Sequence, residues 1–528
     1  MTRVARVCLI LGSLSAASAA MASGQDLGSI DFKTSGSPAA QEHFLKGALL
    51  LHSFEYPDAA DEFREAERIE PGFAMAYWGE AMTDNHPLWM EQNRDAARKA
   101  LERLAPTVEA RRAKAPTERE KMYLDAVEAL YGEGEKEERD RAYAAAMRRL
   151  HERFLDDLDA EALYALSLLG TCERTRETAV YMQAAAIAED VFAKNPRHPG
   201  AAHYLIHCYD DPAHAPLGMR AARVYSKIAP AAVHALHMPS HIFFAMGMWD
   251  EAVASNEQSW AASVDRAKRK NLPPSDHSFH ALSWLEYAYL QLGRRGDARR
   301  TLDLMEADAK AGGGQTADTL DAMRAVWIVE TGDCATPPRA DASRARDRFA
   351  RGVCALAAKD SAAARRELDA MKTRGAEKPD VHAHPGMGYR ESRDGEIAAV
   401  LAKELEAKIA ASSGDAAGAA RLASQAATSE DAMTFDFGPP PIVKPAHELA
   451  GELLLAANRP ADARREFDAS LAHAPGRSAS LLGLARSAEA SGDVAAARDA
   501  RARLAANWRH ADPGLPGSAE ARVAAGAP

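Results

Sequence analysis

The chain has 528 residues, of which 47% are hydrophobic and only 6% aromatic, and a formal net charge of -11 at pH 7. This acidic balance argues against a nucleic-acid partner. No stretch beyond the N-terminus has the roughly 18 consecutive apolar residues of a membrane span. Because one compact core rarely exceeds about 250–300 residues, we expect several domains or a solenoid.

The N-terminus has the features of a secretory signal peptide over residues 1–22. Arg3 and Arg6 precede an apolar run that ends in an A-x-A cleavage site at residues 20–22, with residues 17–19 as an alternative site. We therefore expect a periplasmic or secreted mature protein that begins with a flexible segment over 23–39. A disulfide is allowed in that compartment, and Cys334 with Cys354 is the expected pair.

Helix formers dominate the remaining chain and alternating strand patterns are absent, so the predicted class is all-α. Residues 40–90 contain a 34-residue helical-hairpin pattern in which Ala59, Phe63, Ala66 and Pro71 take its small, aromatic, small and proline positions. Residues 91–170 are predicted to be helical but irregular. A capping box of Thr117 and Glu120 is expected to begin one helix there.

The hairpin pattern returns in the second half of the chain. Residues 171–310 include HALHMPSHIFFAMGMWDEAVASNEQSW, with GMWDEA as the turn between its two helices. Further helical repeats with long loops are expected over 311–440, and two regular repeats over 441–508, where Ala463 and Ala497 are 34 residues apart. Residues 509–528 are predicted to be a disordered tail.

The mature chain resembles the tetratricopeptide-repeat proteins. It is most similar to a group of exported bacterial repeat proteins with the strings YWGEAM, HALHMPSHIF and KPAHEL, which occur here in YWGEAMTDNHPLW, HALHMPSHIFFAMG and KPAHELAGELLL. The resemblance implies a helical-hairpin solenoid, wound as a right-handed superhelix, and an exported location. It implies no activity. Proteins of this repeat class bind protein or peptide partners in a concave groove lined by the first helix of each repeat.

Histidines gather in one part of the chain, where six of the 18 lie between residues 203 and 241. Spacings of three and four residues place side chains on one face of a helix. On the repeat frame that the resemblance supplies, neighbouring first helices direct these histidines into one groove. The predicted metal ligands are His203, His207, His234, His237 and His241. Additional ligands, or partners that orient the histidines, are expected among Asp210, Asp211, Asp276 and His280.

Neutral imidazole is a good ligand for zinc, copper or iron, and the sequence does not choose among these metals. Pro239 lies inside the segment that carries His234, His237 and His241. Because proline lacks an N–H and clashes with the preceding turn, the helix either kinks there or begins there. In the second case the argument for a shared face weakens for His234 and His237.

Three functions are compatible with these patterns. The first is an exported tetratricopeptide scaffold or binding protein whose groove holds a polyhistidine transition-metal site. The second is a metal-dependent enzyme of hydrolase or oxidase type that uses the same site, with Asp210 or Asp211 as general base. The third is a peptide-binding adaptor without metal.

Overall fold

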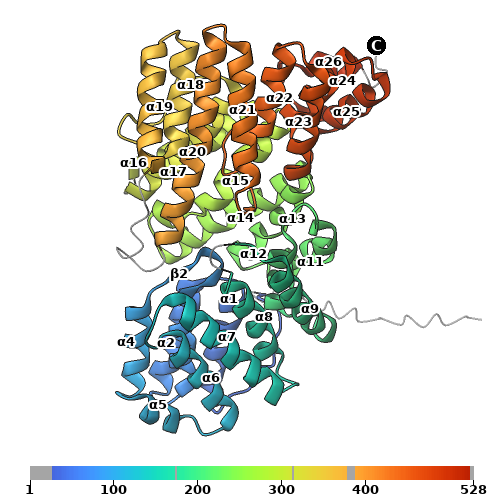
Figure 1. Ribbon diagram of the computed structural model, residues 1–528. Helices are drawn as coiled ribbons and strands as arrows, with labels where there is room; N and C mark the ends of the chain where they lie inside the picture. Colours follow the sequence, from blue (N-terminus) through green and yellow to red (C-terminus); the bar gives the residue numbers. More distant parts are fainter. Residues whose placement is uncertain (1–25, 173–174, 312–313, 377–386, 524–528) are drawn as a thin grey trace, which may run out of the picture.

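The computed structural model describes residues 26–172, 175–311, 314–376 and 387–523. Antiparallel helical hairpins follow one another along the chain, and most helices pack on their neighbours in sequence (Figure 1). The predicted all-α, tetratricopeptide-type solenoid is confirmed. The described strands are only β1 (Asn85–His86) and β2 (Glu91–Gln92), which pair antiparallel.

The N-terminal group of helices lies at the bottom of Figure 1, in blue to teal. It consists of α1 (Pro38–His52), α2 (Tyr56–Ile69), α3 (Ala74–Met82), η1 (Pro87–Trp89), α4 (Arg94–Leu104), α5 (Val108–Lys114), α6 (Glu118–Leu130), α7 (Lys136–Arg153), α8 (Leu158–Gly170) and α9 (Thr178–Lys194). The irregular segment therefore contains α4 to α8. The predicted capping box begins α6, where the Thr117 side chain accepts from the Glu120 N–H and the Glu120 side chain from the Thr117 N–H.

The green central helices join this group to the rest of the chain. They are α10 (Pro199–Tyr209), α11 (Ala215–Ile228), α12 (Val233–His237), α13 (Pro239–Ala245), α14 (Trp249–Lys270), η2 (Pro274–Asp276), α15 (Phe279–Gln291), α16 (Arg295–Ala311) and α17 (Gly314–Thr331). The C-terminal helices, yellow to red, are α18 (Ala345–Ala357), α19 (Ser361–Ala376), α20 (Met387–Ser412), α21 (Ala416–Asp431), α22 (Ala446–Ala456), α23 (Pro460–His473), α24 (Ser478–Ala490), α25 (Val494–Asn507), η3 (Trp508–His510) and α26 (Ser518–Val523).

Glycine lets the aromatic residue of a hairpin pack against the next helix. An added Cβ on Gly79 of α3 would lie 2.3 Å from the Phe63 ring of α2. In the C-terminal repeats a Cβ on Gly483 of α24 would lie 2.2 Å from the Phe467 ring of α23. The same contact therefore sets the approach of consecutive hairpins near both ends of the chain.

One segment expected to be flexible, 23–39, and one expected to be disordered, 509–528, are ordered where the structure describes them. In the segment 23–39, Leu27 and Phe32 are only 3% and 1% exposed, because they pack into the core of the N-terminal group. In the tail 509–528, η3 and α26 form, and Leu515 and Ala521 are buried. Short apolar side chains that find a surface on distant helices explain both differences.

The remaining expectations on chain organisation have mixed outcomes. Cys334 and Cys354 form the predicted disulfide, which links the segment after α17 to α18. The signal peptide over 1–22 lies outside the described residues. Among those described, no helix is both long and apolar enough to cross a bilayer.

Candidate metal centre

Three helices of the central group carry the five histidines predicted as metal ligands. His203 and His207 lie one turn apart on α10, His234 and His237 on α12, and His241 on α13. Pro239 is the first residue of α13, so the helix is interrupted there because proline cannot donate the hydrogen bond that would continue it. Met238 keeps helical angles (φ -54°, ψ -36°), and the face therefore continues across the break.

The structure brings all five predicted histidines together. Ring centroids are 4.9 Å apart for His203 and His207, 5.0 Å for His203 and His234, and 5.1 Å for His207 and His241. His280 of α15 joins them, with its ring centroid 4.5 Å from that of His237. Chain segments separated by up to 77 residues thus converge on one cluster of six imidazoles, which we call the histidine cluster.

Four rings of the histidine cluster are buried, whereas an open groove was expected; His234 is partly exposed and His280 is exposed. His203, His207, His237 and His241 are at most 1% exposed. Aromatic side chains account for the burial. Phe54 lies 4.2 Å from His203, Trp284 4.8 Å from His237, and Phe437 4.7 Å from His241, measured between ring centroids. Phe437 comes from the segment between α21 and α22, far along the chain from the histidines.

Hydrogen bonds on the outer side of the cluster fix the protonation of three rings. His203 Nδ1 lies 2.7 Å from the carbonyl oxygen of His52, which can only accept, so Nδ1 carries the proton. His241 Nδ1 lies 3.0 Å from Asp210 Oδ2, and His207 Nδ1 lies 3.4 Å from the same oxygen. Asp210 is held in turn by Arg176, whose Nη1 donates to Oδ1 at 2.6 Å.

Asn256 fixes a fourth ring in the same way. Its amide nitrogen donates to the Ala252 carbonyl at 2.8 Å, so its oxygen faces His237. His237 Nδ1 lies 2.6 Å from that oxygen and is therefore the donor. In neutral His203, His207, His237 and His241 the proton is thus on Nδ1, and each Nε2 presents a lone pair.

These lone pairs meet inside the cluster. His237 Nε2 lies 3.2 Å from His241 Nε2, with no N–H between them in their neutral forms. His207 Nε2 is buried without a hydrogen-bond partner in the part of the chain that the structure describes. Such an arrangement is unfavourable unless a cation lies between the nitrogens.

A proton is a poor candidate for that cation. Burial, together with the neighbouring imidazoles, lowers the pKa of His203, His234 and His237 well below its usual value. Burial lowers the pKa of His241 to about 4, although the hydrogen bond to Asp210 opposes the shift. The rings therefore stay neutral near pH 7, which is the form that binds metals.

The three aspartates predicted as additional ligands or partners lie in different surroundings. Asp210 orients His207 and His241. Asp211 is bound to Arg176 at 3.2 Å and to His214 at 2.8 Å. Asp276 is exposed and lines an open cleft with Arg266 and Lys270, so the loop before α15 does not bring it to the histidines.

Asp210 is not suited to the role of general base. Burial alone would raise its pKa, but Arg176 and the hydrogen bonds from His207 and His241 hold that pKa far below the usual range. Asp211 already pairs with Arg176 and His214. The geometry thus removes the two carboxylates that the enzyme hypothesis relies on.

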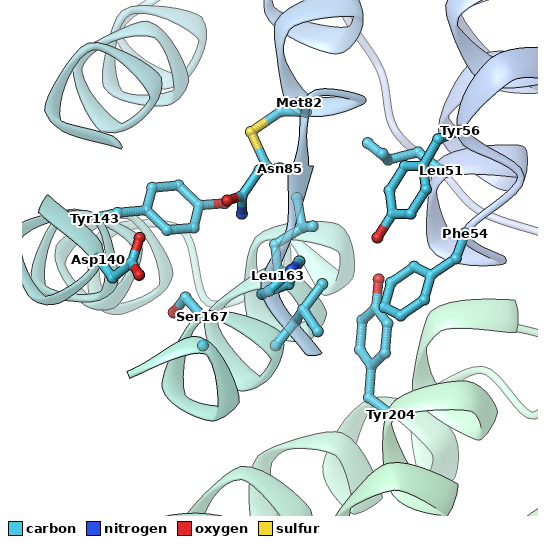
Figure 2. A pocket seen from close by; sticks show the side chains of 13 residues that line it. Leu51, Phe54, Tyr56, Met82, Asn85, Asp140, Tyr143, Leu163, Ser167 and Tyr204 are labelled. Carbon is cyan, nitrogen blue, oxygen red and sulfur yellow. The ribbon is translucent and has the colours of Figure 1, made fainter. Parts of the chain in front are cut away.

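Further residues of the site have no signal in the sequence. Asn256, Phe54 and the His52 carbonyl come from elements whose distance from the histidines in sequence gives no clue to their contact. Phe54 has a left-handed backbone (φ 56°), which costs energy in a residue with a side chain. It also lines a small cavity of about 20 Å³ on the N-terminal side, large enough for a single water (Figure 2).

Within the described chain, two groups outside the histidine cluster could also offer three ligand atoms within 4.8 Å of one another. One comprises His52, Asp159 and His198, all buried; His52 Nε2 already lies 3.0 Å from Asp159 Oδ1. The other comprises Asp431, His447 and His473 near the surface. In it the His447 ring lies within 2.7 Å of Glu466 and 2.9 Å of Asp431, so it is engaged with carboxylates.

No protein-family model and no curated protein matches this chain. Among solved structures, it is similar to the human IFIT1 dimer with m7Gppp-AAAA at 13% identity, over 90% of each chain, with a TM-score of 0.37. It is also similar to yeast Tom70 at 14% identity, over 92% of this chain and 95% of that one, with a TM-score of 0.31. At such low TM-scores these likenesses carry no argument about function.

Proposed function

We propose that this chain is an exported helical-repeat binding protein whose histidine cluster holds a transition metal. The observation that carries the proposal is the convergence of unprotonated Nε2 atoms within the cluster. Hydrogen bonds from the Nδ1 atoms to Asp210, Asn256 and the His52 carbonyl set the tautomers of these histidines. Metal-binding histidines characteristically donate their second N–H to a carboxylate or carbonyl in this manner. The all-imidazole donor set suits zinc, copper or iron.

Cys208 does not extend this donor set to sulfur. Its thiol is completely buried, burial raises its pKa far above the usual range, and it lies in none of the groups of converging ligand atoms in the described chain. The site thus combines nitrogen ligands with an ionised carboxylate that touches two of them from behind. This composition supports tight holding of a borderline metal ion rather than a thiolate-type centre.

The role that we propose is binding, delivery or scaffolding rather than catalysis. Asp210 and Asp211 are engaged with Arg176 and histidines, which supports a metal site without a free general base. The stacked hairpins would present protein-binding surfaces, as the repeat pattern suggests. Export rests on the sequence of residues 1–22 alone, and cell fractionation with mass analysis of the mature N-terminus tests it.

The metal content of the purified protein tests the central claim. The full chain, made without a histidine tag and purified in metal-containing buffer, should retain zinc, copper or iron through gel filtration. The double variant His207→Gln/His237→Gln should lose this metal and keep its helical circular dichroism. His43→Gln, which alters a histidine paired with Glu62 outside the cluster, is the matched control. The proposal would be refuted if the wild-type protein retained no metal after incubation with zinc, copper or iron.

A further inference from the structure

The histidine cluster contains two sets of three histidine ligands, and a third group, His207, Asp210 and His241, overlaps both sets. In the first set, one ring nitrogen from each of His203, His207 and His234 lies within 4.8 Å of the others. In the second set, the same holds for His237, His241 and His280. Each set contains one pair of Nε2 atoms 3.2 Å apart, His203 with His234 and His237 with His241.

This separation fits two ligands of a common ion. Nitrogens bound at about 2.0–2.1 Å around a tetrahedral ion are about 3.3 Å from each other. Each set supplies three such nitrogens, and a tetrahedral site needs four ligands, so each set could leave a position for water or a partner's side chain. One four-coordinate ion could not use all six imidazoles.

The two sets are related by the repeat of the fold. His203 and His237 are 34 residues apart, as are His207 and His241, which is the length of one repeat. Each set has two buried histidines one helical turn apart, and a third, more exposed histidine from the following first helix. That third ligand is His234 in one set and His280 in the other.

Asp210 lies between the two sets. Its Oδ2 accepts from Nδ1 of His207 in the first set and from Nδ1 of His241 in the second. Because Nδ1 and Nε2 are on different sides of an imidazole, each ring directs its Nε2 away from the shared carboxylate. One buried, ionised side chain thus orients ligands of both sets.

From this duplication we infer that the protein binds two transition-metal ions, one in each three-histidine set. The inference rests on the proposed function and adds its stoichiometry and ligand assignment. The ligand class is a first-row divalent ion that accepts imidazole nitrogen, with Zn²⁺ as the probe. The first site uses His203, His207 and His234, and the second uses His237, His241 and His280.

Counting the bound metal tests the inference. All proteins carry His473→Gln, because His473 belongs to the surface group with Asp431 and His447 and is 59% exposed. Chelator-treated full-length protein is loaded with Zn²⁺, passed through gel filtration and measured by elemental analysis. We expect two ions per chain, one after adding His234→Gln, one after adding His280→Gln, and two after adding His43→Gln.

The outcomes separate the inference from the proposed function. One ion per chain, lost in both the His234→Gln and His280→Gln proteins, would mean a single shared site and would overturn the inference while keeping the proposed function. No bound ion would overturn both. Because His280 is exposed and His234 partly exposed, these substitutions should leave the fold intact, and circular dichroism of each variant checks this.

Discussion

The metal-free protein should lose stability in mild acid through His241, whose folded pKa is about 4. At pH 8 the ring is neutral in both states and contributes nothing. Below the ordinary pKa of about 6.5, His241 is protonated in the unfolded chain. In the folded protein the same ring stays neutral until the pH approaches 4. Stability is therefore lost as pH falls, and from pH 8 to pH 5 the loss due to His241 is about 2 kcal/mol.

The perturbation is His241→Gln, which keeps an N–H for Asp210 and removes the titration. Urea unfolding in chelator, followed by circular dichroism at pH 8 and pH 5, should show a pH-dependent loss smaller by about 2 kcal/mol in the variant than in the wild type. Proton uptake on unfolding at pH 5, which needs no two-state model, should fall by about 0.9 per chain.

His447 provides a control of opposite sign. Hydrogen bonds to Glu466 and Asp431 raise its pKa to about 9. Its stabilisation is complete below the unfolded pKa and is lost as pH rises through 9, so it adds about 2 kcal/mol between pH 8 and pH 5. His447→Gln should therefore steepen the acid loss. Equal pH dependence in the wild type and His241→Gln, or a change of the same sign as in His447→Gln, would refute the reasoning.

Three further outcomes are expected. Asn256→Leu should weaken zinc binding about 10–100-fold in competition with a chelating dye, because His237 loses the partner that fixes its tautomer, whereas Asn256→Asp should keep tight binding; equal affinities would contradict this role. Arg477→Met should cost about 3–5 kcal/mol in urea unfolding because Glu330 and Glu448 both lose a buried cationic partner and Glu448 keeps only Lys444, whereas Arg486→Met, which breaks an exposed pair with Glu520, should cost under about 1 kcal/mol. Lys359→Gly should raise the thermal midpoint by relieving a left-handed residue (φ 60°) worth about 1 kcal/mol, and an unchanged or lower midpoint would be evidence against that strain.

The sequence predicted those features of the fold and the site that depend on the spacing of residues along the chain. The hairpins follow from turn residues and the 34-residue period, and the meeting of His207 with His241 follows from that period. The partners that fix the rings could not be predicted, since Asn256 and the His52 carbonyl are ordinary residues until the superhelix places them. Asp276 was expected among the additional ligands or orienting partners, but it lies at η2 and lines another cleft.

The break at Pro239 has a mechanical consequence. In a stack of hairpins each hairpin contacts only its neighbours. The least stable interface between hairpins therefore determines where the chain first unfolds under force or heat. Ions bound by α10, α12, α13 and α15 would link three successive hairpins across the helix break at Pro239. Metal loading would then make the interrupted junction between α12 and α13 the mechanically most stable part of the solenoid. In single-molecule pulling experiments, this junction would unfold last.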